Sequence, residues 1–303
     1  MSYDIRSPLI YPGSKGSVVH ELLPLITEKG FKEYREPFIG SASIYLAVRQ
    51  QCGGSDCSKR YWINDLNLEL YNFWKMLQRD TKGVIEKTLE FKNDGRFDGR
   101  GKELFYHLKR NLGSFKTEEK RIDLAAAYYI LNRSAFSGGS LVSGFSQDHY
   151  DYITDDRIKD LSKIGKLLAN NDVRITHLDY QKLVETSPLV GHSNEDVTLV
   201  LDPPYFAATG SGLYGQGGKK FDNTHKSFDH LRFAKVMKEC KYRFLITYDD
   251  SPYIRNLYKW ANQKSWVMTH KMRKDKIGRE LLISNFTLND IVKTKQLSME
   301  DYV

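Results

Sequence analysis

The stretch Leu199-Val200-Leu201-Asp202-Pro203-Pro204-Tyr205 decides how this chain folds. An apolar run ends in an acid, and two prolines follow that cannot continue a β ladder because proline has no backbone N–H. The sequence therefore predicts a buried strand over residues 197–201 that stops at Asp202. In open α/β sheets, ligands bind at the carboxyl ends of the strands. We therefore expect residues 202–205, called here the tetrad, to lie in a functional site.

Strand-like and helix-like patterns alternate on both sides of this strand. Residues 34–38 read as a strand that leads into Gly40, and residues 41–49 read as the helix that follows. A second strand, over residues 60–63, ends at Asn64-Asp65. Later in the chain we expect a helix over residues 228–240 and strands over residues 173–177, 243–248, 265–271 and 281–286. This alternation of strands and helices predicts an α/β fold, with a Rossmann-like sheet covered by helices on both faces.

The alternation of strands and helices is interrupted between the second and third predicted strands. Residues 67–154 read as successive helices, the clearest over residues 118–131 with Thr117 as its N-cap. We therefore expect a catalytic domain of residues 1–66 and 155–303 with a mostly helical insertion of residues 67–154. The glycine- and serine-rich residues 134–146 predict a hairpin or loop. The glycine-rich residues 206–226 predict a cover over the site.

Composition places the chain among ordinary globular proteins and suggests a polyanionic partner. It has 303 residues, of which 40% are hydrophobic and 28% charged, with a net charge of +8. Residues 252–282 hold eight basic and two acidic side chains, which fits either a phosphate-facing edge or a solvated loop. Neither the three cysteines nor the eight histidines have metal-ligand spacing, so we expect no metal. The absence of a signal-peptide or membrane-span pattern predicts a cytoplasmic protein.

The tetrad carries groups that suit methylation of an amine. The exocyclic nitrogen of adenine is a poor nucleophile because its lone pair is delocalised into the ring. If the Asp202 side chain and a proline carbonyl accepted its two N–H bonds, the nitrogen would move toward sp3 geometry and the lone pair would become available. Tyr205 can stack on a base that has been flipped out of the duplex. The alternative is an ordinary strand end with an exposed aspartate.

Together with four other segments, the tetrad resembles the Dam-type family of adenine-N6 DNA methyltransferases. The resemblance covers most of the chain and follows the order of that family's α arrangement. Its segments are Tyr11-Pro12-Gly13-Ser14-Lys15, Glu36-Pro37-Phe38-Ile39-Gly40-Ser41-Ala42-Ser43, Asn64-Asp65, the tetrad, and Leu281-Leu282-Ile283-Ser284-Asn285-Phe286. It implies a site-specific methyltransferase that uses S-adenosylmethionine and acts on a flipped adenine in double-stranded DNA. A cognate restriction endonuclease is a possible partner.

The resemblance also implies roles for individual residues. The tetrad (Asp202, Pro203, Pro204 and Tyr205) would hold the target base. Residues at the cofactor would be Tyr11, Lys15, Phe38, Gly40, Asp65, Asp179 and Asp202, with Asp65 at the ribose hydroxyls and Asp179 at the adenine amino group. The residues leave simpler alternatives open: Lys15 could be a surface lysine, and Asp65 and Asp179 could be helix caps.

The predicted DNA contacts come from the insertion and from the basic segment. They are Arg133, Ser137, Ser140, Lys271, Arg273, Lys274 and Lys276. Relatives that read GATC carry an arginine in the glycine-rich segment after Asn132-Arg133, whereas residues 134–146 hold no arginine or lysine. We therefore expect a recognition site other than GATC, read partly through serine hydroxyls such as Ser143, unless a basic residue from another helix restores the usual contact.

Two other functions remain open on the residues alone. The same tetrad chemistry would serve a methyltransferase acting on cytosine N4, an RNA base or a protein glutamine. A catalytically inactive DNA-binding module could also keep the fold, although the intact Asp202 and Asp65 argue against it.

Overall fold

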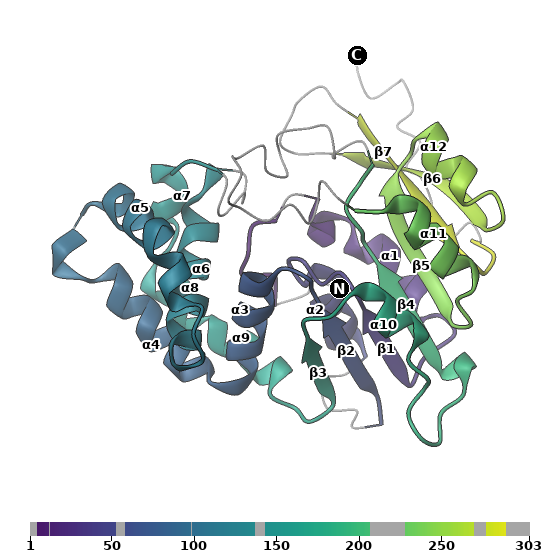
Figure 1. The fold of residues 1–303 in the computed structure, drawn as a ribbon, viewed down its shortest axis with the longest axis horizontal. Coiled ribbons are helices and arrows are strands. Elements are labelled where there is room, and N and C mark those ends of the chain that lie inside the picture. Colours follow the sequence, from purple (N-terminus) through teal and green to yellow (C-terminus); the bar gives the residue numbers. More distant parts are fainter. Residues whose placement is uncertain are drawn as a thin grey trace, which may run out of the picture.

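The computed structural model describes residues 5–11, 13–52, 58–97, 99–136, 143–206, 228–269 and 277–288. Its centre is a seven-stranded sheet of order β3-β2-β1-β4-β5-β7-β6 (Figure 1). The strands are β1 (Glu33–Glu36), β2 (Arg60–Asn64), β3 (Val173–Thr176), β4 (Val197–Leu201), β5 (Arg243–Asp249), β6 (Asn262–Thr269) and β7 (Ile277–Ser284). The predicted strands are thus confirmed, with β6 beginning and ending earlier than expected.

The two central strands are β1 and β4, which pair in parallel with Tyr34 opposite Thr198. All five residues of β4 are buried, as its unbroken apolar sequence predicts for a strand covered on both faces. The pairs β1–β2, β2–β3 and β4–β5 are also parallel, whereas β7 runs antiparallel between β5 and β6. This α/β sheet is the predicted Rossmann-like methyltransferase fold.

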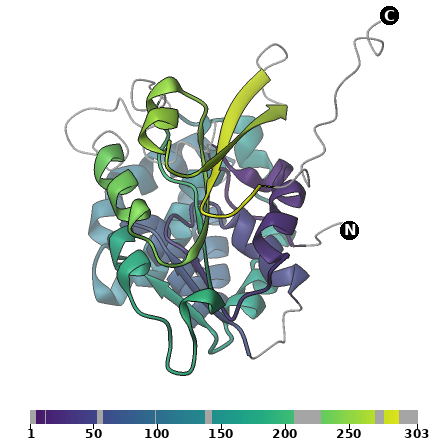
Figure 2. The same ribbon diagram turned by 90° about the vertical axis from the view of Figure 1, so that its right-hand side faces the viewer.

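Helices cover both faces of the sheet. Figure 2 shows α1 (Val19–Thr27) on one side of the strands and α11 (His230–Lys238) on the other. Helix α2 (Ser43–Gln51) packs on α1, and α10 (Tyr180–Glu185) packs on α11. Two apolar cores result, one on each face, and each contains residues from the central strands.

A block of helices lies beside the β3 edge of the sheet (Figure 1). Its centre is α6 (Arg121–Ser134), which is buried over most of its length and contacts α3, α4, α5 and α7. The other members are α3 (Leu68–Arg79), α4 (Thr81–Lys92), α5 (Gly101–Asn111), α7 (Gln147–Asp151), α8 (Asp155–Lys159) and α9 (Leu161–Leu168). Thr117 was wrongly predicted as the cap of α6: it precedes a separate 3-10 turn, Glu118–Lys120, and α6 begins only at Arg121.

The glycine-rich segment after α6 begins and ends as a hairpin. Ala135 and Phe145 form an antiparallel bridge, and the backbone N–H of Phe136 donates to the carbonyl of Gly144. Residues 137–142 lie outside the described residues, as do residues 207–226 of the predicted cover. A last short helix, α12 (Pro252–Leu257), connects β5 to β6. Among the described residues, we find no helix with the length and apolar character needed to span a membrane.

Candidate functional site

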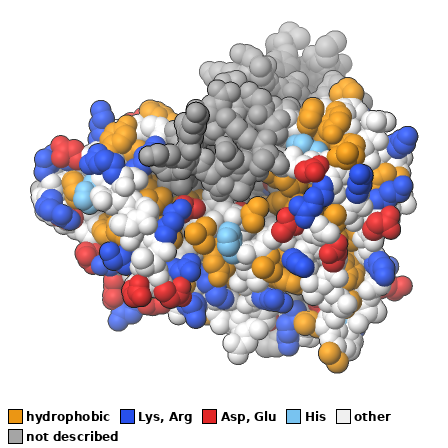
Figure 3. All heavy atoms as spheres, in the orientation of Figure 1, with side chains coloured by type: hydrophobic (Ala, Val, Ile, Leu, Met, Phe, Trp, Pro, Cys, Tyr) orange, Lys and Arg blue, Asp and Glu red, His pale blue; other side chains and the backbone are white. Residues whose placement is uncertain are grey.

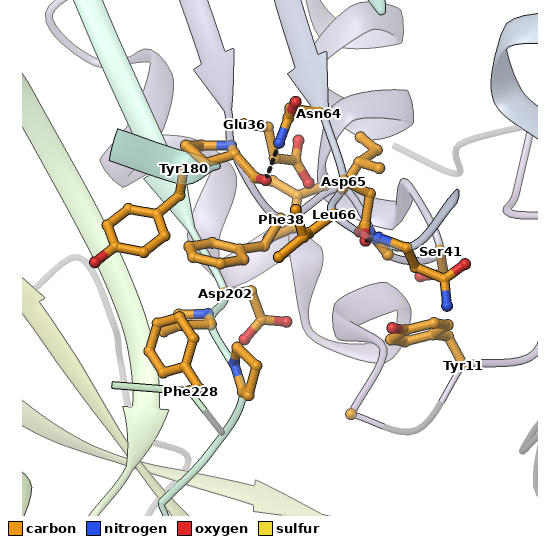
Figure 4. Close-up of a pocket in the computed structure, with 18 of the residues that line it drawn as sticks. Tyr11, Glu36, Phe38, Ser41, Asn64, Asp65, Leu66, Tyr180, Asp202 and Phe228 are labelled. Carbon is orange, nitrogen blue, oxygen red and sulfur yellow. Dashed lines mark hydrogen bonds between the residues drawn. The ribbon is translucent and has the colours of Figure 1, made fainter. Parts of the chain in front are cut away.

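A pocket of ≈ 230 Å³ opens at the carboxyl ends of β1, β2 and β4. The structure brings every residue predicted at the cofactor or the target base to this one place: the lining includes Tyr11, Lys15, Phe38, Gly40, Asp65, Asp179, Asp202, Pro203, Pro204 and Tyr205. Figure 4 shows Phe38, Tyr180 and Phe228 on one side of the pocket and Tyr11 on the other, with Asp202 between them. The pocket is therefore a mixed surface of aromatic rings and carboxylates.

The loop after β1 forms the floor of the pocket and turns sharply at Gly40. Gly40 has φ +46°, in the left-handed region, and a side chain there would point at the ring of Tyr11, 3.4 Å away. Ala42 follows at φ 58°, a conformation that side chains other than glycine rarely adopt. Ala42 therefore adopts a backbone conformation that favours glycine, which adds local strain to the turn.

Asp65 fastens this loop to the end of β2. Its carboxylate accepts hydrogen bonds from the backbone N–H of Gly40 at 3.1 Å and of Asn67 at 2.9 Å. The cap of α3 is Asn67, whose side chain accepts from the N–H of Leu70. Asp65 is therefore not the cap of that helix, and its carboxylate lies in the pocket lining.

Asp179 does cap a helix, and it also forms an ion pair at the pocket. One carboxylate oxygen accepts from the N–H of Gln181 at the start of α10. The same carboxylate binds the guanidinium of Arg232 from α11 at 2.9 and 3.0 Å. Since Asp179 and Arg232 both line the pocket, capping does not exclude a role at a ligand.

Lys15 is buried and is not a surface lysine. Its side chain is 1% exposed, and its ammonium binds both carboxylate oxygens of Asp202 at 2.8 and 2.9 Å. A third hydrogen bond goes to the carbonyl of Gly13 at 2.8 Å. Because a buried charge is costly unless it is paired and hydrogen-bonded, the N-terminal motif and the tetrad hold each other in place.

The carboxylate of Asp202 is held from a second side by β5. The hydroxyl of Thr247 donates to Oδ1 of Asp202 at 2.6 Å. Tyr205 lies next to this pair: the ammonium of Lys15 is 5.0 Å from the centre of its ring, and the ring stacks on Tyr248 with centroids 6.0 Å apart. The tetrad is therefore fixed in position by a lysine, a hydroxyl and an aromatic ring.

Two further carboxyl groups surround the Lys15–Asp202 pair. Glu36, at the end of β1, is buried, and burial raises its pKa well above the usual range; the hydroxyl of Tyr34 donates to it. Glu280, on β7, lies 3.9 Å from the ammonium of Lys15, and burial raises its pKa to about 7. The site therefore contains more acidic side chains than the sequence motifs indicated.

Three residues of the site were not predicted from the sequence: Glu36, Thr247 and Glu280. Glu36 stands directly before Pro37-Phe38, so its place in a quoted motif could have identified it. Glu280 is a charged residue at the head of the apolar run Leu281-Leu282-Ile283, an unusual composition for a buried strand. Thr247 gave no such signal, because threonine is common in strands.

The predicted DNA contacts are only partly described. Arg133 lies in the last turn of α6, partly buried, and desolvation lowers its pKa. The carbonyl of Ser143 accepts a hydrogen bond at 2.9 Å from the ammonium of Lys109 on α5, so a lysine from another helix stands at the glycine-rich segment. The remaining six predicted contacts lie outside the described part of the chain. They are two serines and four basic residues: Ser137, Ser140, Lys271, Arg273, Lys274 and Lys276.

Basic side chains on the described surface do not gather in one place in the view of Figure 3. Lys and Arg are interspersed there with Asp and Glu. Within the described ranges, no group of three or more His, Cys, Asp or Glu side chains is arranged to hold a metal ion.

Comparison with known proteins agrees with this geometry. Residues 11–273 match the model of the D12 class N6 adenine-specific DNA methyltransferases. The chain is 22% identical to a DNA adenine methylase of Vibrio cholerae, over 90% of this chain and 92% of that protein. It is 24% identical to the DNA N-6-adenine-methyltransferase of Escherichia phage P1 and 22% identical to the modification methylase StsI of Streptococcus sanguinis.

The lengths of these relatives differ. The match covers 84% and 93% of this chain but only 31% of the phage protein and 43% of the Streptococcus protein, so the chain spans less than half of these two. The family model covers all the pocket segments from Tyr11 to Arg232. The chain belongs to the D12 class N6 adenine-specific DNA methyltransferase family.

Proposed function

We propose that this protein transfers a methyl group from S-adenosylmethionine to N6 of a flipped adenine in double-stranded DNA. One observation carries the proposal: the tetrad lies at the edge of a pocket, with the carboxylate of Asp202 held by Lys15 and Thr247. A carboxylate positioned in this way is ready to accept an N–H bond of an amine. The names and family of the relatives supply the identity of that amine.

The lining of the pocket fits S-adenosylmethionine chemically. Asp65 offers a carboxylate for ribose hydroxyls, and Phe38 and Tyr180 offer aromatic surface for a purine. Gly40 keeps the backbone free of a side chain beside Tyr11. Carboxylates and aromatic rings also suit the positive sulfonium. When bound, the cofactor supplies a methyl group that is activated for attack by a nucleophile.

The residues of the tetrad would prepare the amine. Asp202 and a proline carbonyl would accept its two N–H bonds and so release the nitrogen lone pair toward the methyl group. Tyr205 would stack on the flipped base, which has left the duplex because its amine is inaccessible there. Groups held rigidly before the reaction stabilise charge in a transition state most effectively, and Lys15 and Thr247 supply that rigidity.

We also propose that the two parts of the fold have different functions. Residues 1–66 and 155–303 would carry catalysis, and the inserted residues 67–154 would read the DNA. Arg133 would contact the backbone, Ser137, Ser140 and Ser143 the bases, and Lys271, Arg273, Lys274 and Lys276 the phosphates. The cytoplasmic location and a cognate restriction endonuclease remain predictions.

Transfer of tritium from labelled S-adenosylmethionine to duplex DNA, followed by nucleoside analysis, tests the proposal. We expect N6-methyl-2′-deoxyadenosine as the only labelled nucleoside. Label in N4-methylcytosine, in RNA or in protein glutamine would point to a different amine. A protein that binds DNA and transfers no label would be an inactive module. The Asp202→Ala variant is the matched control for contaminating activity.

A further inference from the structure

We propose that Glu280 is a positioning residue for the tetrad: it shares the ammonium of Lys15 with Asp202 and thereby controls how strongly Asp202 accepts hydrogen bonds from the target amine. This inference rests on the proposed methyl transfer and adds a residue from β7 that lies outside the sequence motifs of the site.

The geometry behind the proposal is a buried lysine between two carboxyl groups. The ammonium of Lys15 lies 2.8 Å from Asp202 and 3.9 Å from Glu280, and the side chains of Lys15 and Glu280 are 1% and 5% exposed. Solvent screening is weak at such a place. The charge state of Glu280 therefore acts directly on Lys15 and, through it, on Asp202.

The groups around Glu280 come from four elements. Lys15 faces it from the 3-10 turn Lys15–Ser17, and Asp202 and the hydroxyl of Tyr205 face it from the end of β4. Asp249 stands opposite on β5, and Trp266 stands opposite on β6. Lys15 and Tyr205 favour the charged form of Glu280, whereas burial, Asp202 and Asp249 favour the neutral form. The balance places its titration near neutral pH.

The two charge states predict different activities. With Glu280 neutral, the whole charge of Lys15 is directed at Asp202, whose oxygens are then weaker acceptors. With Glu280 ionised, Lys15 is shared between two carboxylates, and Asp202 keeps more negative charge for the N–H of the amine. We therefore expect the rate of methyl transfer to rise several-fold as the pH passes through about 7.

The test compares the wild type with Glu280→Gln, which keeps the shape of the side chain and removes its titration. Single-turnover methyl transfer and the affinity for S-adenosylhomocysteine are measured across neutral pH. In the variant we expect the rate step near pH 7 to disappear and the rate above it to fall several-fold, with cofactor affinity unchanged. A variant that keeps the step, or one whose rate falls by the same factor at every pH, would overturn the proposal.

A second measurement does not depend on activity. A raised pKa in the folded state means that Glu280 contributes stability at low pH that is lost as the pH rises through about 7. The melting temperature of the wild type should therefore fall relative to that of Glu280→Gln over this range. In Lys15→Met the fall should extend to higher pH than in the wild type, because the cation that favours ionised Glu280 is gone. A fall that ends at the same pH in Lys15→Met and in the wild type would show that Lys15 and Glu280 are not coupled.

The rate measurements and the melting measurements together show whether the proposed function or the role of Glu280 is wrong. If the wild type transfers no methyl group at any pH, the proposed function fails, and the melting curves alone decide whether Glu280 titrates against Lys15. If the wild type is active but the melting curves of wild type and Glu280→Gln have the same pH dependence, Glu280 does not titrate near neutral pH and the inference is wrong. Tyr205→Phe offers a further check, since loss of the hydroxyl should move the step to higher pH.

Discussion

Asp202 illustrates at the scale of one residue how the site is prepared in advance. Lys15 and Thr247 already occupy part of its carboxylate, so its orientation does not depend on the substrate. A carboxylate has about four acceptor positions, which leaves room for the amine. The single residue therefore links the N-terminal motif, the tetrad and β5.

Replacing Asp202 with alanine should reduce the rate of methyl transfer by at least about 100-fold, as does removal of other preorganised polar groups. Cofactor should still bind with reduced strength. Single-turnover kinetics with isothermal titration of S-adenosylhomocysteine measure the two effects. Asp202→Asn is the control for packing around Lys15. Wild-type turnover in a folded Asp202→Ala protein would show that the catalytic assignment is incorrect.

Replacing Asp65 with alanine should weaken cofactor binding by about 1.5–3 kcal/mol, the usual value for a hydrogen bond to a charged group, with little change in DNA affinity. Loss of the Asp65 carboxylate also removes the acceptor for the N–H of Gly40, which loosens the loop after β1. Calorimetry with S-adenosylhomocysteine measures this. Asp160→Ala, an exposed acid outside the pocket, is the matched control. Equal affinities in both variants would leave Asp65 with a structural role only.

Individual elements were predicted well where composition dictates them. An unbroken apolar run such as residues 197–201 has no stable place except a covered strand, and β4 confirms it. The predicted start of α6 was wrong. Threonine is a residue type that commonly caps helices, but after Thr117 the chain first makes a 3-10 turn. The antiparallel insertion of β7 beside β5 could not be predicted, since pairing between strands depends on contacts that periodicity does not contain. For the same reason the sequence did not place Glu280 at the site.

The basic segment between β6 and β7 yields a prediction at the scale of an element. Neutralising Lys271, Arg273, Lys274 and Lys276 together should weaken binding equally for target and random duplexes. Each lost phosphate contact should lower the slope of log affinity against log salt by roughly 0.9. Fluorescence anisotropy over a salt series measures both.

The control for this prediction is a quartet of exposed lysines that precede β1 and β5, at the amino ends of the strands: Lys29, Lys32, Lys238 and Lys241. Neutralising these four lysines changes the net charge by the same amount as neutralising the four residues of the basic segment. Because they lie at the opposite edge of the sheet from the pocket, the slope of log affinity against log salt should stay nearly unchanged. Identical slopes for the two quartets would mean that the segment is a solvated loop.

The glycine-rich segment after α6 should read a sequence other than GATC, because it lacks the arginine that contacts guanine in relatives. Each good bidentate contact contributes about 1–3 kcal/mol of discrimination. Plasmid from an expressing host without its own adenine methylase should remain sensitive to an enzyme that GATC methylation blocks. Complete protection would contradict this, and Lys109, which already binds the segment, would be the first residue to replace.

The whole molecule brings one site together from distant parts of the chain, from Tyr11 to Arg232. A ligand in this pocket contacts loops after β1, β2 and β4, and it should stabilise the folded state as a unit. At a concentration of about 100 times its Kd, S-adenosylhomocysteine should add roughly 2.7 kcal/mol to the free energy of unfolding. Chemical denaturation with and without ligand measures this gain. The denaturation midpoint of Asp65→Ala should shift only at higher ligand concentrations than that of the wild type. An unchanged midpoint in the wild type would mean that the pocket does not bind this demethylated form of the cofactor.

The ion pair between Lys15 and Asp202 joins residues 187 positions apart, and this separation has a consequence for synthesis. A ribosome adds about 5–20 residues per second, so Lys15 is made roughly 10–40 s before the aspartate it binds. During that interval the N-terminal motif has no carboxylate from the tetrad to pair with. The pocket therefore forms only after β4 has been synthesised, and a nascent chain cannot hold the cofactor there before that point.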